Sequence, residues 1–415
     1  MSSGSDIQKR LYHAFPSAVA IQEDGWMVYP SSTQDVAGVM SIANQCGCPV
    51  LTSRHTPDEP VSPASSPVIR LSMEKMTGVS AISETGMTVE VQAGIAMRNL
   101  EIVMNDHGMT SGYVLLPDVD PPVIHFINDE TLSESSMLYG RLQCFVLGAE
   151  GVLPSGEVFR IKPAPSRASG PDILSLLLSE HGRLSIVTSL VLRIWRQPKA
   201  RRIIAAFFGD VENALACAGG IASSGIRLAA GRIYAPGWAD PAEPSAEAGP
   251  HMAVFVLEGE PAVVDTLAVH VDKIIRDRGG EPARPQHHLA TKFVKLPRAD
   301  EGEEIELVSA SCDWTAAPKI HLEAHSRLEE RLVGTRVSDF FHEGCRITWS
   351  VRESGMGKDL LVGLADLLRR LGGHLLSRHS LADRGLQPGM VYDGLMQKKL
   401  EQLKGKMDPN KVIAQ

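Results

Sequence analysis

Cysteine is scarce in this chain, with six residues among 415. Their spacing provides neither a dense disulfide framework nor the CxxCxxC run of an iron–sulfur protein. Cys46 and Cys48 are separated by one residue, which is closer than the usual CxxC redox or zinc pair. We therefore favour a packing role for these thiols over a metal or redox role. If electrons leave this protein, we expect a partner to accept them.

Long apolar runs and an excess of positive charge are also missing. No stretch approaches about 18 consecutive apolar residues, so no transmembrane segment is predicted. The first residues are small and polar with no apolar region behind them, which predicts neither a secretory signal nor a membrane anchor and favours a cytoplasmic location. The net charge is -8, and because phosphate binding needs a basic face, nucleic acid is excluded as the main partner.

The most informative stretch that is present runs over residues 139–188 and is marked by glycines. It contains an apolar run at 146–153, a Pro-Ser-Gly sequence in turn position at 154–156, and a short helix predicted over 174–178. A further strand follows Gly182. A core built from strands and close turns can use such glycines at positive φ.

Flanking segments extend this alternation of strands and helices. Residues 28–50 predict a strand, a capped helix and a turn, and residues 89–93 alternate as a half-buried strand before a helix at 97–107. Beyond residue 198 the pattern predicts an α+β region with an antiparallel sheet. Its expected strands and helices are, in order, 201–208, 211–223, 252–257 and 261–278.

The order of these segments resembles the FAD-linked oxidase family, whose fold is that of vanillyl-alcohol oxidase and p-cresol methylhydroxylase (the PCMH-type fold). In pattern the chain is most similar to the flavin subunits of glycolate oxidase and D-lactate dehydrogenase. The motifs that carry the resemblance are V-E-V-Q-A-G at 89–94, L-P-D through Y-G at 116–140, S-E-H-G-R-L-S-I-V-T at 179–188 and M-D-P-N-K-V-I at 407–413.

This resemblance implies an α+β fold in three parts. Residues 1–198 would form a two-part PCMH-type FAD-binding domain with a break near 80–110. Residues 199–370 would form an α+β cap, or substrate, domain with an antiparallel sheet. Residues 371–415 would return to the FAD-binding domain.

The resemblance also assigns cofactor-binding positions for FAD, although both phosphate-binding loops depart from the family pattern. The first loop, at 52–60, has no glycine and contains two prolines and two acidic residues, so it offers few backbone donors. In the second loop, His125 and Phe126 replace a pair of glycines. The assigned positions are Arg54, His55, Tyr139, Gly140, Gly148, Ser169, Gly170, Asp172, Gly182, Ser185 and Ile186. Covalent flavin attachment at His55 is not favoured, and Ser185 replaces a family glycine.

Two functions are consistent with these residues. By resemblance, the chain is an FAD-linked oxidoreductase subunit of the glycolate or D-lactate (2-hydroxyacid) dehydrogenase type, in which a hydride passes from substrate to flavin. Its expected partners are a paralogous flavin subunit, an iron–sulfur electron-transfer subunit, or both. Because the phosphate-binding loops have changed, the alternative is a flavin-free structural or regulatory subunit of a heteromeric oxidase complex.

Two residues are candidates for catalysis. The resemblance places His379 near flavin and substrate, where a histidine that titrates near neutral pH can accept a hydroxyl proton. Arg352, together with Arg346, is predicted to clamp a substrate carboxylate, with surface salt bridges as the alternative. His321 and His325 have the i,i+4 spacing of a metal site, but a solvated helix face is favoured and no metal is predicted.

Overall fold

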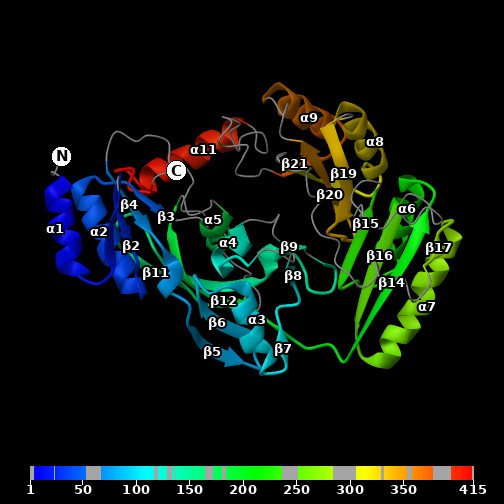
Figure 1. Cartoon of the computed structure of the whole chain (residues 1–415), viewed down its shortest axis with the longest axis horizontal. Helices are drawn as coiled ribbons and strands as arrows, with labels where there is room; N and C mark the ends of the chain where they lie inside the picture. Colours follow the sequence, from blue (N-terminus) through cyan, green and yellow to red (C-terminus); the bar gives the residue numbers. More distant parts are fainter. Residues whose placement is uncertain are drawn as a thin grey trace.

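The computed structural model describes residues 4–22, 24–52, 67–115, 120–128, 133–134, 136–163, 172–179, 184–235, 251–283, 305–328, 331–352, 358–376 and 394–413. These residues form two lobes of mixed helix and sheet (Figure 1). The N-terminal lobe contains one sheet of four strands and one of five, and the second lobe is built on a sheet of eight strands. The predicted α+β class is therefore confirmed. Within the described residues, no helix is long and apolar enough to cross a membrane.

The first sheet has the strand order β1-β2-β4-β3. Its strands are β1 (Val19–Gln22), β2 (Gly25–Val28), β3 (Val50–Thr52) and β4 (Val68–Leu71), of which β2, β4 and β3 run parallel. Helices α1 (Gly4–Ala14) and α2 (Thr33–Cys46) pack beside it. Helix α2 starts where the sequence predicts, because Ser32 and Asp35 form a capping box, and it ends at Gly47 in the left-handed conformation.

The second sheet is antiparallel, with the order β11-β10-β12-β6-β5. Its strands are β5 (Val79–Ser83), β6 (Thr88–Gln92), β10 (Val146–Val152), β11 (Val158–Ile161) and β12 (Ile186–Arg193). The turn predicted at the Pro-Ser-Gly sequence is confirmed, since β10 and β11 on either side of it pair as an antiparallel hairpin. One face of this sheet packs under α3 (Met97–Asn105), α4 (Val123–Asn128) and α5 (Ile173–Ser179) to form an apolar core.

Short elements complete this lobe and lead into the second one. Two-stranded pairs are formed by β7 (Met109–Thr110) with β13 (Trp195–Arg196) and by β8 (Val114–Leu115) with β9 (Ser133–Glu134). The 3-10 helices are η1 (Met73–Lys75) and η3 (Leu142–Cys144).

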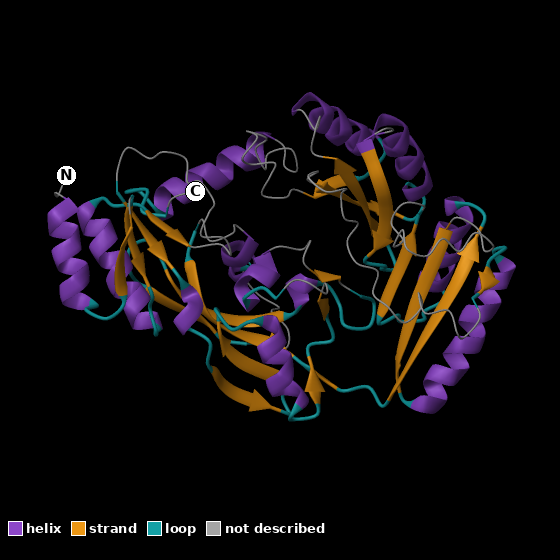
Figure 2. Ribbon diagram, in the orientation of Figure 1, coloured by secondary structure: helices purple, strands orange, loops and turns teal. Residues whose placement is uncertain are grey.

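The eight-stranded sheet of the second lobe, here called the cap, has the order β17-β14-β16-β15-β19-β20-β18-β21. Its strands are β14 (Ala200–Phe208), β15 (Ala230–Tyr234), β16 (His251–Gly259), β17 (Glu281–Pro282), β18 (Ile305–Asp313), β19 (Leu332–Ser338), β20 (Gly344–Arg352) and β21 (His374–Leu376). Its helices are α6 (Val211–Ser223), α7 (Pro261–Asp277), α8 (Ala317–Leu328) and α9 (Lys358–Arg370). They cover one face of the sheet, and the other face is turned toward the N-terminal lobe (Figures 1 and 2).

The C-terminal part of the chain divides between the two lobes. Strand β21 is an edge strand of the cap sheet, next to β18. After α11 (Gly394–Met407), Val412 and Ile413 lie against β3, and the Val50 N–H donates to the Val412 carbonyl at 2.6 Å. The buried Asp408 carboxylate accepts from the N–H groups of Val412 and Ile413 at 2.7 and 2.9 Å, which fixes this last turn.

Candidate cofactor and substrate site

The two sheets of the N-terminal lobe meet at the edge where the parallel strands end. The carboxyl ends of β2, β3 and β4 share this edge, which is where open parallel sheets commonly bind ligands. Ala93 and Gly94 join it from the second sheet, since their N–H groups donate to the carbonyls of Thr188 and Met76, each at 2.9 Å. A Cβ atom on Gly94 would lie 2.0 Å from the Met73 carbonyl oxygen, so only glycine permits this approach.

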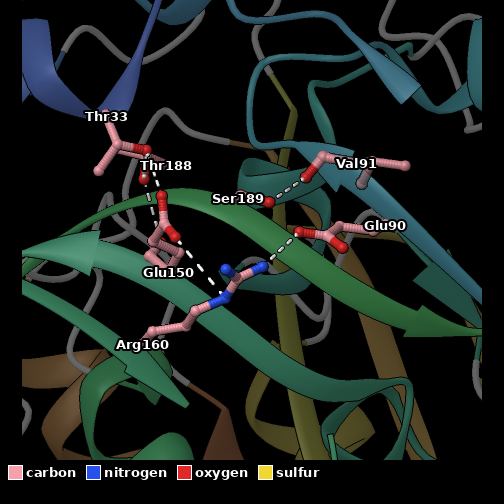
Figure 3. Close-up of polar contacts among 7 residues, drawn as sticks. All are labelled: Thr33, Glu90, Val91, Glu150, Arg160, Thr188 and Ser189. Carbon is pink, nitrogen blue, oxygen red and sulfur yellow. Dashed lines mark hydrogen bonds and ion pairs between the residues drawn. The ribbon is translucent and has the colours of Figure 1, made fainter. Parts of the chain in front are cut away.

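Hydrogen bonds between hydroxyl and carboxylate groups connect the start of α2 to the second sheet across this junction (Figure 3). The Thr33 hydroxyl donates to Glu150 at 2.7 Å and lies 2.9 Å from the Thr188 hydroxyl. Arg160 donates to Glu90 at 3.0 Å and lies 3.7 Å from Glu150. Glu90, Glu150 and Arg160 border a hollow of about 310 Å³ on the sheet face away from the apolar core. Because the ion pairs of Arg160 involve partly exposed side chains, we assign them a positioning role.

Ser185 and Ile186, which the resemblance assigns to cofactor binding, lie directly at the junction. Ile186 begins β12 opposite Val152, and both side chains belong to the core of the first sheet. The Ser185 side chain is fully buried, and its hydroxyl has no hydrogen-bond partner in the structure. A buried hydroxyl without a partner costs stability, so this position fits a ligand with a polar atom such as a nucleotide cofactor.

The start of α2 fits a diphosphate less well. Asp35 accepts from the backbone N–H groups of Ser31 and Ser32 at 2.9 and 3.1 Å. Although burial alone would raise it, the pKa of Asp35 is lowered by these hydrogen bonds and by the two serine hydroxyls. The helix terminus is therefore already occupied by a carboxylate, which would repel a phosphate.

Three other predicted cofactor residues have structural partners of their own. Tyr139 packs against Trp195 and the cap, and its hydroxyl donates to Glu258 of β16. Burial first and the Glu258 contact second raise the pKa of Tyr139. A Cβ on Gly148 would lie 2.7 Å from the Ile161 carbonyl oxygen, so this glycine serves strand packing. Asp172 accepts from the Ser175 N–H at 3.2 Å and caps α5.

Gly140 has φ +92° in the turn after Tyr139, a conformation that favours glycine. Phe126, expected in the second phosphate-binding loop, is fully buried in α4, with its ring 5.9 Å from Tyr113 and 6.5 Å from Phe145. It is therefore a core residue. The remaining predicted site residues, which are Arg54, His55, Ser169, Gly170, Gly182 and His379, lie outside the described residues.

The helix-free face of the cap carries the polar side chains of its central strands. Along β20 the residues facing the helices are apolar, whereas Arg346, Thr348, Ser350 and Arg352 alternate with them on the other face. The Ser309 hydroxyl on β18 lies 2.9 Å from that of Thr348. This face is the part of the cap that is turned toward the N-terminal lobe (Figure 1).

The predicted pairing of Arg352 with Arg346 around one carboxylate is wrong. Both side chains share the polar face, but they are six positions apart along β20, which corresponds to about 20 Å of strand. Arg346 instead forms an ion pair with Asp339 at 2.7 Å. Its neighbours on the same face are Arg336 and Arg232, which lie on β19 and β15.

The solvated helix face predicted for His321 and His325 is also wrong for the first of them. His321 is 6% exposed, and burial lowers its pKa to about 4, with smaller contributions from His325 and His251. The described residues contain no group of three or more side chains able to hold a metal ion.

Sequence reasoning missed Arg232 and Arg336 as site residues. The available signal was the alternation of polar with apolar residues in R-I-Y (232–234), T-R-V-S (335–338) and R-I-T-W-S-V-R (346–352). Alternation predicts one polar face on each strand. It does not predict which strands are neighbours, and the pairing of β15, β19 and β20 is what brings the arginines together.

Comparison with known proteins agrees with this architecture. Residues 26–162 match the sequence model of the FAD binding domain family. Over part of its length the chain is therefore similar to FAD-linked oxidases. It is 25% identical over 234 residues to the mitochondrial D-lactate dehydrogenase [cytochrome] 1 of Saccharomyces cerevisiae, covering 55% of this chain and 39% of that protein. It is also 25% identical over 207 residues to an uncharacterised FAD-linked oxidoreductase of Escherichia coli (strain K12), covering 48% and 42% of the two chains.

Solved structures extend the likeness to the cap. Substrate-bound p-cresol methylhydroxylase matches with a TM-score of 0.76 at 14% identity, covering 100% of this chain and 96% of that chain. Alkyldihydroxyacetonephosphate synthase matches with a TM-score of 0.71 at 16% identity, covering 94% and 76%. The PCMH-type fold with an antiparallel cap sheet is therefore confirmed. The sequence matches, in contrast, span about two fifths of the curated relatives.

Proposed function

We propose that this chain is the flavin-binding subunit of an FAD-linked oxidoreductase that acts on a 2-hydroxyacid. The observation that carries the proposal is the arrangement of two surfaces. The carboxyl ends of β2, β3 and β4 at the junction of the two N-terminal sheets lie within the segment that matches an FAD binding domain. The arginine-bearing face of the cap is turned toward this lobe. FAD would supply a hydride acceptor, and the cap arginines would hold the substrate carboxylate.

The roles of the chain's own residues follow from their positions. Ser185 would hydrogen-bond the cofactor with a hydroxyl that is otherwise buried without a partner. The close approach at Gly94 and the hydrogen bond from Thr33 to Glu150 would hold the two sheets in position around the cofactor. Across the seam between the lobes, Tyr139 contacts Glu258, which orients the cap with respect to the cofactor lobe. His379 remains the proposed proton acceptor.

An electron-accepting partner is part of this proposal. The resemblance to accessory flavin subunits supports an assembly with a paralogous flavin subunit, an iron–sulfur subunit, or both. Co-purification from cells that express all the subunits tests it. A chain that stays alone under these conditions, while its candidate partners associate with each other, would contradict the assembly.

The second candidate is a flavin-free subunit that keeps the fold in order to bind an active paralogue. Two observations favour it. Asp35 already fills the N-terminus of α2, and Phe126 occupies a family glycine position from within the core.

Cofactor content separates the two candidates. The purified chain is denatured and the supernatant is scanned for flavin absorbance, and the apoprotein is melted with and without added FAD. Released flavin, or a melting temperature that rises with FAD, supports the oxidoreductase. A colourless protein whose melting temperature does not change when FAD is added, with and without its partner, would support the flavin-free subunit.

A further inference from the structure

A short segment of the N-terminal lobe, residues 136–141, contacts the cap and is here called the arm. It forms a tight turn, in which the Gly140 N–H donates to the Ser136 carbonyl at 2.8 Å and the Tyr139 N–H donates to the Ser136 hydroxyl at 3.1 Å. Ser136 itself is buried. The arm therefore keeps its shape through hydrogen bonds of its own.

Backbone and side chains of the arm lie against the cap. Met137 packs against the cap core, and the Leu138 N–H donates to the Leu228 carbonyl at 3.0 Å. The Arg141 guanidinium lies over the Phe341 ring, 4.6 Å from its centre. Because Leu228 precedes β15 whereas Phe341 lies between β19 and β20, the arm contacts the cap at two separate places.

Tyr139 makes the most buried side-chain contact of the arm. Its ring packs with apolar residues of β15 and β16, and its hydroxyl donates to Glu258 of β16. The Glu258 side chain is 10% exposed and forms an ion pair with Arg201 at 3.2 Å. Hydrogen bonds to a carboxylate are stronger than those between neutral groups, and burial strengthens them further. Since Leu257 faces the helices, Glu258 lies on the helix-free face of the cap, so this contact fixes that face against the N-terminal lobe.

The arm is also connected to the sheet junction. The Tyr113 hydroxyl donates to the Arg141 carbonyl at 3.1 Å, and the Tyr113 ring lies 5.9 Å from that of Phe126 on α4. Helix α4 is held at the junction, because the Ile124 N–H donates to the Ala93 carbonyl at 3.2 Å. Packed and hydrogen-bonded groups therefore run from the junction through α4 and the arm to the cap.

We propose that the arm couples the cofactor site to the cap, and that Tyr139 and Glu258 are positioning residues for the reaction. Neither acts on the reacting atoms, and together they hold the helix-free face of the cap in place opposite the cofactor. A cofactor at the junction and the Tyr139–Glu258 contact then stabilise the same arrangement of the lobes, so each strengthens the other to the same degree. This inference rests on the proposed function for the identity of the cofactor.

The test is the FAD affinity of variants in this contact, measured by titrating the full-length apoprotein and following flavin fluorescence. Tyr139→Phe removes only the hydroxyl and Glu258→Ala removes its acceptor, and each is expected to weaken FAD binding about fivefold or more. The double variant should bind no more weakly than the weaker single variant, because both changes break one contact. Glu258→Gln keeps an acceptor oxygen and should recover part of the affinity.

The control is Glu260→Ala, which changes an exposed glutamate paired with Lys199, two residues beyond Glu258. It should bind FAD like the wild type. If Glu258→Ala fails to fold, Tyr139→Phe decides, because it keeps the packed ring.

Hydrogen exchange adds a readout that a loss of packing alone would not give. FAD should slow amide exchange in β15 and β16 of the wild type and of Glu260→Ala, and this slowing should be reduced in Tyr139→Phe. A purely structural role for Tyr139 would speed exchange equally with and without FAD, which would refute the coupling.

The outcomes also separate this inference from the proposed function. FAD affinities of Tyr139→Phe and Glu258→Ala equal to that of the control would overturn the coupling and keep the flavin role. A wild type that binds no FAD, alone or with its partner, would overturn the flavin role and with it the coupling.

Discussion

His321 in α8 should make the stability of the cap depend on pH. It is 6% exposed, and burial together with His325 and His251 lowers its pKa to about 4. In the unfolded chain a histidine has a pKa of about 6.5, so between these values the unfolded state binds a proton that the folded state does not. The stability is therefore complete above about pH 6.5 and falls as the pH decreases toward 4.

The expected size of this effect follows from the two pKa values. One pKa unit corresponds to about 1.4 kcal/mol, so His321 should lower the free energy of unfolding by about 3 kcal/mol across this window. The rings of His321 and His325 are 5.9 Å apart, so His325 is one of the causes of the lowered pKa of His321.

Urea unfolding, followed by circular dichroism from neutral pH to about pH 4.5, measures this loss. The variant His321→Gln should lose about 2.5 kcal/mol less than the wild type over this range. The control His270→Gln, which changes an exposed histidine on α7, should follow the wild type. Parallel curves for the wild type and His321→Gln would refute the reasoning.

Two other predictions concern thiols and the sheet junction. Cys144 is exposed and should react with a thiol reagent in the native protein. Cys345 is buried, and its contact with Cys312 and its burial raise its pKa, so it should react only after unfolding. Rapid labelling of Cys345 in mass spectra of the native protein would contradict this. Gly94→Ala should lower the free energy of unfolding by about 2 kcal/mol or more, because the added Cβ would overlap a backbone carbonyl. Gly209→Ala, with open space around the added Cβ, is the control and should have a small effect. Equal unfolding midpoints of the two variants in urea would contradict this.

The elements that the sequence predicted well are those fixed by local signals. The helix at 211–223 has the predicted bounds, since Asp210 caps it and accepts from the Asn213 N–H at 2.7 Å. The hairpin around residues 154–156 follows from its turn residues in the same way. The order of the sequence motifs then predicted the PCMH-type fold, because it reflects the order in which these strands, turns and helices follow one another along the chain.

The site residues were harder to predict, because their environment depends on contacts between distant parts of the chain. In the sequence, Phe126 stands where the family has a glycine of the second phosphate-binding loop. In the structure, its contacts with Tyr113 and Phe145 make it part of the core. Arg346 was paired with Arg352 because they share a strand, whereas strand register places it beside Arg336. His321 is buried by the packing of α8 on the cap sheet, which helical spacing alone does not specify.

The central claim, that the chain binds FAD at the junction of its two N-terminal sheets, is tested most directly by titrating the purified apoprotein with FAD. Flavin fluorescence and the melting temperature are followed together, for the wild type and for Ser185→Val, which removes the unpartnered hydroxyl at this junction. The account predicts saturable binding that stabilises the wild type and is weaker in the variant. No saturable binding by the wild type, alone or with its partner subunit, would contradict it.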